Sequence, residues 1–148
     1  MNNGAAPQGA AYRRQGRMKE QLIKEAIEAR QHAHIPYSHF AVGAAIMTGS
    51  KRIYRGCNVE NASFGLTNCA ERTAIFKAVS EGDRVIEAIA VAADTEGPIS
   101  PCGACRQVMA EFCDENTKIY LTNLHGDTEE WTMAQLLPGA FLATDMKK

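Results

Sequence analysis

Two cysteines three residues apart, Cys102 and Cys105 in SPCGACRQ, are the residues of this sequence best suited to chemistry. Residues three apart share a face in the first turn of a helix. Such a pair occurs in redox couples, in halves of metal sites and among core thiols. Cys69 supplies a third thiol near the start of another expected helix, where it can meet the pair at one sheet edge. Three thiolates that converge on one point are suited to Zn²⁺.

The number of ligands decides whether such a site is structural or catalytic. A structural zinc site has four protein ligands, whereas a catalytic site has three and an open position for water. Cys57, in RGCNVEN, is a possible fourth ligand, although no short spacing links it to the others. Cys113 lies roughly 12 Å along the helix from Cys105, so we expect it to be a core thiol. We favour three ligands and a water over a closed four-cysteine site.

Glu71 supports the open site. In a regular helix Cys69 and Glu71 would diverge by ~200°, so both can face one metal only if Cys69 precedes the helix. A carboxylate beside a metal-activated water can take and return protons. A glutamate in the first turn also stabilises the helix dipole without any further role. The nearby cysteines favour the catalytic interpretation.

The elements that must position these residues follow from hydrophobic periodicity and turn signals. We expect a helix over 18–34, a hairpin of 40–47 and 52–59, a helix over 68–82 beginning near Asn68, a strand over 85–93, a helix over 102–113, a strand over 118–122, and a short helix capped by Thr132. The strand–helix–strand order over 85–122 predicts a parallel crossover. Helices on both faces of one sheet predict an α/β fold, a three-layer α/β/α sandwich.

Composition predicts one ordinary globular domain. The chain has 148 residues, 45% of them hydrophobic, and a net charge of −1 that argues against a broad grip on nucleic acid or an anionic membrane. We expect a disordered tail over 1–17, a single domain over 18–142 and a C-terminal tail over 143–148. No segment has the ~20 apolar residues of a membrane helix. No secretory signal is visible and five cysteines fit a disulfide framework poorly, so we expect a cytoplasmic protein.

Four motifs resemble those of the small, homotetrameric, zinc-dependent cytidine deaminases: HIPYSHFAVGAAI, GCNVENASFGLTNCAERTAIFKAVSEG, SPCGACRQVMAEF and LLPGAF. The resemblance spans about residues 18–141, and its motifs include the Cys-x-Glu and Pro-Cys-x-x-Cys pattern of zinc nucleobase deaminases. The resemblance implies a mixed sheet of about five strands and one Zn²⁺ per subunit on Cys69, Cys102 and Cys105. It implies hydrolytic deamination of cytidine and 2′-deoxycytidine to uridine and 2′-deoxyuridine with release of ammonia, in pyrimidine salvage.

The same resemblance assigns roles to further residues. Glu71 would protonate N3 of the cytosine ring while water attacks C4, and would later help to deliver a proton to the departing amine. Without the resemblance, Asn58 and Glu60 would be interpreted as a polar strand end and Phe40 as a core residue. The substrate-binding residues that it implies are Phe40 on the nucleoside, Asn58 and Glu60 on the ribose hydroxyls, Ala70, the backbone of Ser100, and Phe141 from a neighbouring subunit.

Arg72 is expected to act on the metal through its charge. Three thiolates on Zn²⁺ leave a net charge of −1, which would weaken the metal as a Lewis acid. A guanidinium that hydrogen-bonds to the sulfurs offsets this charge, and the resembled family often places arginine here. The alternative is an ordinary surface arginine on a helix.

Other functions remain open at this stage. A deaminase of a related nucleoside, such as a blasticidin S deaminase, would share the zinc motifs. A polynucleotide-editing deaminase is disfavoured because no basic stripe with interleaved aromatics is present. A redox protein would use only Cys102 and Cys105 and would leave Cys69 and Glu71 without a role. A zinc-stapled binding module would make Glu71 dispensable.

Overall fold

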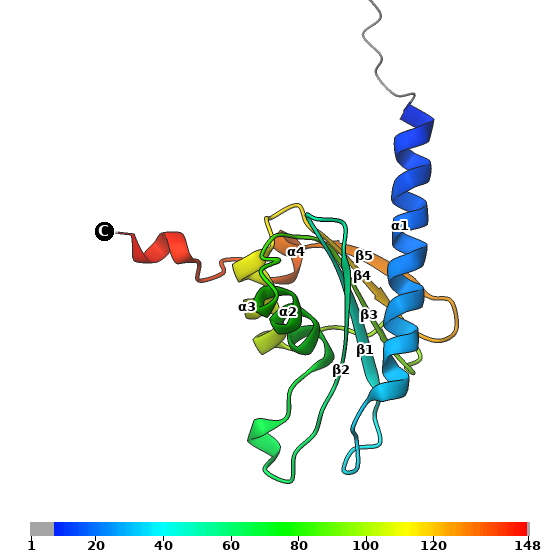
Figure 1. The fold of residues 1–148 in the computed structure, drawn as a ribbon, viewed down its shortest axis with the longest axis vertical. Coiled ribbons are helices and arrows are strands. Elements are labelled where there is room, and N and C mark those ends of the chain that lie inside the picture. The colour runs from blue at the N-terminus through cyan, green and yellow to red at the C-terminus, as the bar shows by residue number, and fades with distance from the viewer. Residues whose placement is uncertain (1–7, 148) are drawn as a thin grey trace, which may run out of the picture.

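A five-stranded mixed sheet in the order β2-β1-β3-β4-β5 separates helix α1 from helices α2 and α3 (Figure 1). The computed structural model describes residues 8–147. Strands β3 and β4 are parallel and the other neighbours are antiparallel, so the predicted sandwich and the parallel crossover are confirmed. The elements are α1 Gln8–Ala29, β1 Val42–Thr48, β2 Ile53–Cys57, α2 Ala70–Ser80, β3 Ile86–Ala93, α3 Gly103–Phe112, β4 Lys118–Thr122, β5 Thr128–Thr132 and α4 Met133–Leu136, with 3-10 turns at Arg30–His32, Phe64–Leu66 and Ala143–Met146.

The strand directions bring two helix starts to one edge of the sheet. Both β2 and β3 are antiparallel to β1, so they run in the same direction. Helix α2 follows β2 and helix α3 follows β3 along the chain. Their first turns therefore lie beyond the same sheet edge, where ligand sites of α/β proteins gather.

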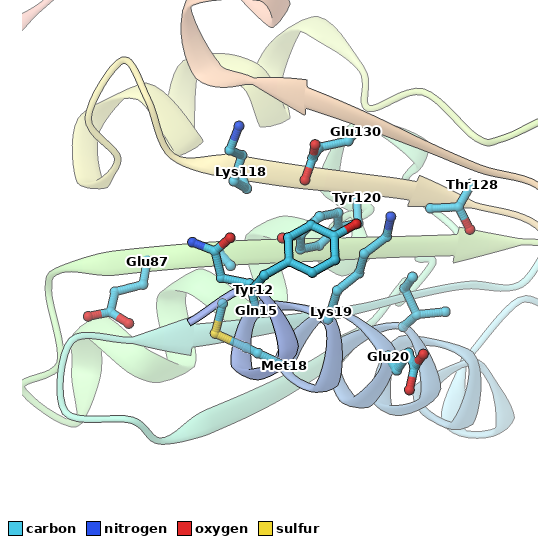
Figure 2. A pocket seen from close by; sticks show the side chains of 13 residues that line it. Tyr12, Gln15, Met18, Lys19, Glu20, Glu87, Lys118, Tyr120, Thr128 and Glu130 are labelled. Carbon is cyan, nitrogen blue, oxygen red and sulfur yellow. The ribbon is translucent and has the colours of Figure 1, made fainter. Parts of the chain in front are cut away.

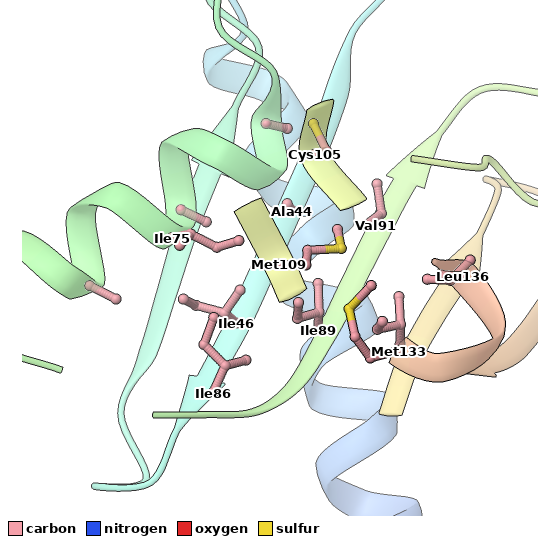
Figure 3. Packing of buried hydrophobic residues seen from close by; sticks show 14 of the residues in the cluster. Ala44, Ile46, Ile75, Ile86, Ile89, Val91, Cys105, Met109, Met133 and Leu136 are labelled. Carbon is pink, nitrogen blue, oxygen red and sulfur yellow. The ribbon is translucent and has the colours of Figure 1, made fainter. Parts of the chain in front are cut away.

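The two faces of the sheet bury side chains of different size. Alternation along β3 places alanines on the face under α1, where Ala88, Ala90 and Ala92 pack with Leu22 and Ala26. A Cβ on Gly43 would lie 1.9 Å from the Ala26 carbonyl oxygen, so this glycine lets α1 approach the sheet closely. The opposite face carries larger residues. Figure 3 shows Ile46, Ile75, Ile89, Val91 and Met109 packed between the sheet and helices α2 and α3.

Three details of the predicted elements are wrong. Helix α1 begins at Gln8, so the expected disordered tail is wrong for residues 8–17, and residues 1–7 lie outside the described part. This segment is rich in Ala, Arg and Gln, which extend a helix that is anchored by its packed half. The elements expected from the sequence do not include strand β5, because TEEWT is short and polar. It is mostly exposed, as sheet edges often are. Helix α2 is preceded by Cys69 as its N-cap residue, and not by Asn68.

The C-terminal tail expected over 143–148 stays a prediction. Ala143–Met146 forms a 3-10 turn within the expected C-terminal tail, while residue 148 lies outside the described part. The short helix capped by Thr132 is confirmed, and its capping box with Gln135 is complete. Among the helices of residues 8–147, none combines the length and the apolar character that crossing a bilayer requires.

Gly56 controls how closely α2 approaches β2. A Cβ at this position would lie 2.3 Å from the Ala70 carbonyl oxygen and 2.5 Å from the Ala74 amide nitrogen. Both are backbone atoms in the first turns of α2, which cannot move without displacing the helix. The glycine thus sets the position of the helix start that carries Cys69.

We predict that Gly56→Ala lowers the free energy of unfolding by about 1–3 kcal/mol, because overpacking forces backbone shifts. The bound zinc should also become easier to remove, since the start of α2 moves. Chemical denaturation and a competition titration with a zinc chelator measure the two effects. Gly97→Ala is the matched control, because no atom lies within 4 Å of the added carbon. Equal behaviour of the two variants would contradict the prediction.

Candidate metal centre and active site

Two of the three clustered cysteines are N-cap residues. Cys69 precedes α2 and Cys102 precedes α3, both with extended backbone angles, and Cys105 is the third residue of α3. Neither N-cap thiol makes a capping hydrogen bond. A serine or aspartate at these positions would turn its oxygen toward the helix, whereas here the two sulfurs remain available to a ligand.

The three sulfurs are spaced as a zinc site requires. The Sγ atom of Cys102 lies 3.9 Å from that of Cys69 and 3.3 Å from that of Cys105, and all three lie within 4.8 Å of one another. Tetrahedral zinc with Zn–S bonds of 2.3 Å separates its sulfur ligands by about 3.8 Å. The three cysteines that the sequence predicted as ligands are therefore brought together, and their geometry fits the ion.

The other two cysteines lie outside this cluster. Within the described residues, Cys57 does not join the three sulfurs, so the closed four-cysteine site is not formed. Burial raises the pKa of Cys57, and it raises the pKa of Cys113 to about 12. Cys113 packs against the main hydrophobic cluster. Both side chains are therefore neutral thiols, in agreement with the expected core position of Cys113.

Hydrogen bonds favour the thiolate form of Cys69. A bond from the Cys105 thiol, together with the Arg72 guanidinium, lowers the pKa of Cys69 to about 5. Arg72 donates from Nη2 to the Cys69 sulfur at 3.2 Å, and this bond raises the pKa of the arginine. The Nε atom of Arg72 is buried without an acceptor among residues 8–147. The arginine thus lies where the charge-offsetting role requires it, and that role stays a prediction.

Glu71 lies beside the cysteines at the start of α2. It is the second residue of the helix and is only 4% exposed. Burial raises the pKa of its carboxyl group, and the nearby Cys69 charge adds to the effect. Cys69 is extended and precedes the helix, whereas Glu71 lies within it. This change of backbone conformation is what the spacing of Cys69 and Glu71 predicted for two side chains that face one metal.

The sequence interpretation missed two residues that hold Cys69 in place. The Thr73 hydroxyl donates to the Cys69 carbonyl at 3.0 Å and accepts from Asn68 Nδ2 at 3.1 Å. Asn68 also exchanges two backbone hydrogen bonds with Val59. A threonine four residues after an N-cap position is a recognisable signal for such a bond to the backbone.

The residues predicted to hold the nucleoside form a second hydrogen-bonded group. The Asn58 amide donates to the Phe40 carbonyl at 2.8 Å and accepts from the Val42 amide at 2.9 Å. The Glu60 carboxylate accepts bonds from the Tyr37 and Ser38 amides, both at 3.1 Å. Phe40 is 40% exposed, so its ring is accessible to a ligand and does not belong to the core.

Three other predicted substrate-binding residues have different surroundings. The Ser100 hydroxyl accepts a hydrogen bond from Arg106 at 2.7 Å in the loop that precedes Cys102. Ala70 is completely buried and offers no accessible surface in this chain. Phe141 is 60% exposed, and Gln107 of α3 donates to its carbonyl. The ring of Phe141 therefore lies in solvent in the single chain, and the role predicted for each residue stays a prediction.

A groove of about 780 Å³ lies on the other face of the sheet. It runs between α1 and strands β3 to β5, where Figure 2 shows Lys19, Tyr120 and Glu130 among its lining side chains. The Lys19 ammonium group lies 5.4 Å from the centre of the Tyr120 ring. No cysteine and no predicted site residue lines this groove. The clustered thiols at the helix starts, and not this groove, therefore mark the candidate active site.

Comparison with known proteins identifies the family of the chain. The family profile described as the cytidine and deoxycytidylate deaminase zinc-binding region matches residues 17–121, which defines the class as a zinc-binding deaminase domain. A cytidine deaminase from Halalkalibacterium halodurans is 62% identical over 128 residues, which are 86% of this chain and 97% of that protein. A probable cytidine deaminase from Dictyostelium discoideum is 46% identical over 128 residues, 86% of each chain.

A solved structure extends the agreement to the fold. The crystal structure of cytidine deaminase from Burkholderia pseudomallei superposes with a TM-score of 0.80 at 52% sequence identity. The match covers 82% of this chain and 98% of that one. The chain belongs to the cytidine deaminase family, as the motifs of its sequence predicted.

We predict that Arg72→Ala lowers kcat or zinc affinity by about 10- to 100-fold, the usual cost of removing a hydrogen-bond partner of a metal ligand. Arg72→Lys keeps the positive charge but loses the guanidinium fork. Its kcat and zinc affinity should therefore lie between those of the wild type and those of Arg72→Ala. Steady-state kinetics and metal analysis by mass spectrometry measure both quantities. Arg84→Ala, on an exposed loop, is the control. Unchanged activity and metal content in Arg72→Ala would remove the proposed role.

Proposed function

We propose that this protein catalyses the zinc-dependent hydrolytic deamination of cytidine and 2′-deoxycytidine, with release of ammonia, as a step of pyrimidine salvage. The observation that carries the proposal is the cluster of three thiols with a buried carboxyl group beside it, in a chain of this family. A requirement for three reduced cysteines supports a cytoplasmic location. The proposed binding partner is a small nucleoside, and neither nucleic acid nor a membrane is proposed as a partner.

The reaction replaces the amino group on C4 of the pyrimidine by the oxygen of water. Zinc, when bound by Cys69, Cys102 and Cys105, lowers the pKa of a water molecule to about 7. The buried carboxyl group of Glu71 lies next to this position and serves as the proton carrier. It accepts the proton of the attacking water, delivers one to N3 of the ring, and helps to protonate the departing amine.

The nucleoside is held by the second hydrogen-bonded group. Glu60 accepts hydrogen bonds that lower the pKa of its carboxyl group, the Ser38 hydroxyl making the largest contribution, so the group is an anion at neutral pH. An anionic carboxylate is a strong acceptor for the hydroxyl groups of a sugar. Asn58 supports the same site, and the exposed ring of Phe40 offers an apolar surface to the base or sugar.

We predict that the zinc-loaded protein converts cytidine to uridine. The decrease in ultraviolet absorbance during this conversion measures the rate. Removal of the metal by a chelator should abolish turnover, and added zinc should restore it. Glu71→Gln should bind zinc normally but lose about 10²- to 10⁴-fold in kcat, the usual contribution of a proton-transferring residue. Glu81→Gln, at the exposed C-terminal end of the same helix, is the matched control.

Three results would decide against the proposal. No turnover of cytidine by the zinc-loaded protein would exclude the activity itself. Full activity of Glu71→Gln would leave a zinc-stapled domain with another catalytic group. A rate on blasticidin S that exceeds the rate on cytidine would assign the related antibiotic nucleoside as the substrate.

A homotetrameric assembly is the remaining part of the proposal. The C-terminal segment leaves the body of the chain beside α3 and α4 (Figure 1). Phe141 and Met146 in this segment are 60% and 66% exposed. A chain that exposes large apolar side chains on a projecting segment needs a partner surface for them. We propose that Phe141 completes the active site of a neighbouring subunit.

We predict that inactive variants at Glu71 and Phe141 complement each other. Glu71→Gln and Phe141→Ala chains, co-expressed in equal amounts, should form mixed assemblies in which roughly a quarter of the sites combine an intact Glu71 with an intact Phe141. Activity should therefore reappear. A mixture of Glu71→Gln with Cys102→Ala is the control, because Phe141 is intact in both chains and every site carries one of the two defects. The absence of recovery in the first mixture would place Phe141 outside the neighbouring site.

A further inference from the structure

We propose that Ser38 is a positioning residue for substrate binding, which holds the Glu60 carboxylate in the orientation that receives the sugar. This inference rests on the proposed function and adds a residue that the motif pattern did not single out. Ser38 is the residue through which Glu60 and the backbone of Phe40 are joined. Its hydroxyl donates to Glu60 Oε2 at 2.5 Å and accepts from the Phe40 amide at 3.0 Å.

The two bonds of this hydroxyl fix its direction. A serine hydroxyl has one proton and two lone pairs. The Phe40 amide occupies a lone pair, which directs the proton of Ser38 toward Glu60. The other carboxylate oxygen, Oε1, accepts the amides of Tyr37 and Ser38. Both oxygens of Glu60 are therefore held by one short segment, and the hydroxyl of Ser38 supplies the only side-chain bond to Glu60 among the described residues.

The segment that carries Ser38 has little packing to hold it. Residues 36–40 are all exposed. Between Ser38 and Phe40, His39 has a φ of 56°, a left-handed conformation that is unfavourable for a residue with a side chain. The Ser38–Phe40 bond closes the turn around this residue, as serine hydroxyls do in loops. Because burial contributes so little here, hydrogen bonds hold the segment. They are the bonds from Tyr37 and Ser38 to Glu60, and the bond from Asn58 to the Phe40 carbonyl.

The position of Glu60 is fixed from the opposite side by backbone pairing. Its amide donates to the His34 carbonyl at 2.8 Å, and the preceding Val59 pairs with Asn68, the residue before the first zinc ligand. The backbone of Glu60 is thus connected to the metal centre through the pairing of Val59 with Asn68. Its side chain is hydrogen-bonded to the 36–40 segment. Ser38 links these two attachments. Loss of its hydroxyl should loosen the carboxylate and leave the cysteines and Glu71 in place.

The test compares Ser38→Ala with Ser38→Thr in the zinc-loaded enzyme. Ser38→Ala should raise KM for cytidine about tenfold, with kcat changed less than twofold, because a hydrogen bond to a charged group is lost. Ser38→Thr keeps the hydroxyl and should restore the wild-type KM. Ser80→Ala is the control, since this exposed serine bonds only to a backbone carbonyl at the far end of α2.

A substrate that lacks the 2′- and 3′-hydroxyls of the sugar separates positioning of Glu60 from general damage to the loop. On 2′,3′-dideoxycytidine, Ser38→Ala should change kcat/KM less than twofold. In a Glu60→Gln background, Ser38→Ala should likewise change KM for cytidine less than twofold, since the carboxylate it orients is gone. An equal loss on both nucleosides, or additive effects of the two substitutions, would overturn the role of Ser38.

The outcomes also separate this inference from the proposed function. Turnover by the wild type, with a KM raised in Glu60→Gln and unchanged in Ser38→Ala, overturns the role of Ser38 alone. Unchanged KM in Glu60→Gln overturns the sugar-binding role of Glu60 and the role of Ser38 with it. No turnover of cytidine by the wild type overturns the proposed function and both residue roles.

Discussion

The convergence of three cysteine thiols at the starts of two helices is the constraint on which the rest of the structure depends. Thiolates repel one another, so they must be held by the backbone and neutralised by a cation. Here the parallel directions of β2 and β3 bring both helix starts to one edge. Gly56 removes the side chain that would keep α2 away from the sheet. Arg72 adds a positive charge at the Cys69 sulfur.

The motifs of the sequence were sufficient for the metal centre because its ligands lie at fixed places relative to helix starts. Cys69 and Glu71 stand at the start of α2, and Cys102 and Cys105 at the start of α3, so short-range spacing defines the directions within each pair. The shared direction of β2 and β3 then brings the two pairs together. The fold class followed for the same reason, since a strand–helix–strand unit has one common handedness and direction. The five-strand count came from family resemblance, because TEEWT in β5 has no apolar alternation.

The parts that could not be predicted depend on tertiary contacts or on small differences in free energy. Residues 8–17 contain small and polar side chains that suit a tail as well as a helix, and only continuity with the packed half of α1 makes them helical. The bonds of Ser38 and Thr73 require knowledge of which backbone groups come near them. Asn58 and Glu60 were assigned by resemblance, because a polar strand end has the same composition as a sugar-binding site.

The metal-binding and substrate-binding residues are supported in different ways, and this difference follows from their chemistry. A proton carrier and a zinc ion act within a distance of a bond, so their groups lie on helix starts packed against a buried sheet, where Cys105 is fully buried. Phe40 and its segment are exposed, as the proposed entry and release of a nucleoside would require. Exposure removes the packing that would fix such a segment. Hydrogen bonds replace it, and the carboxylate of Glu60 serves both as their acceptor and as the proposed acceptor of the sugar. The carboxylate proposed to bind the sugar thereby also holds the neighbouring segment through its hydrogen bonds.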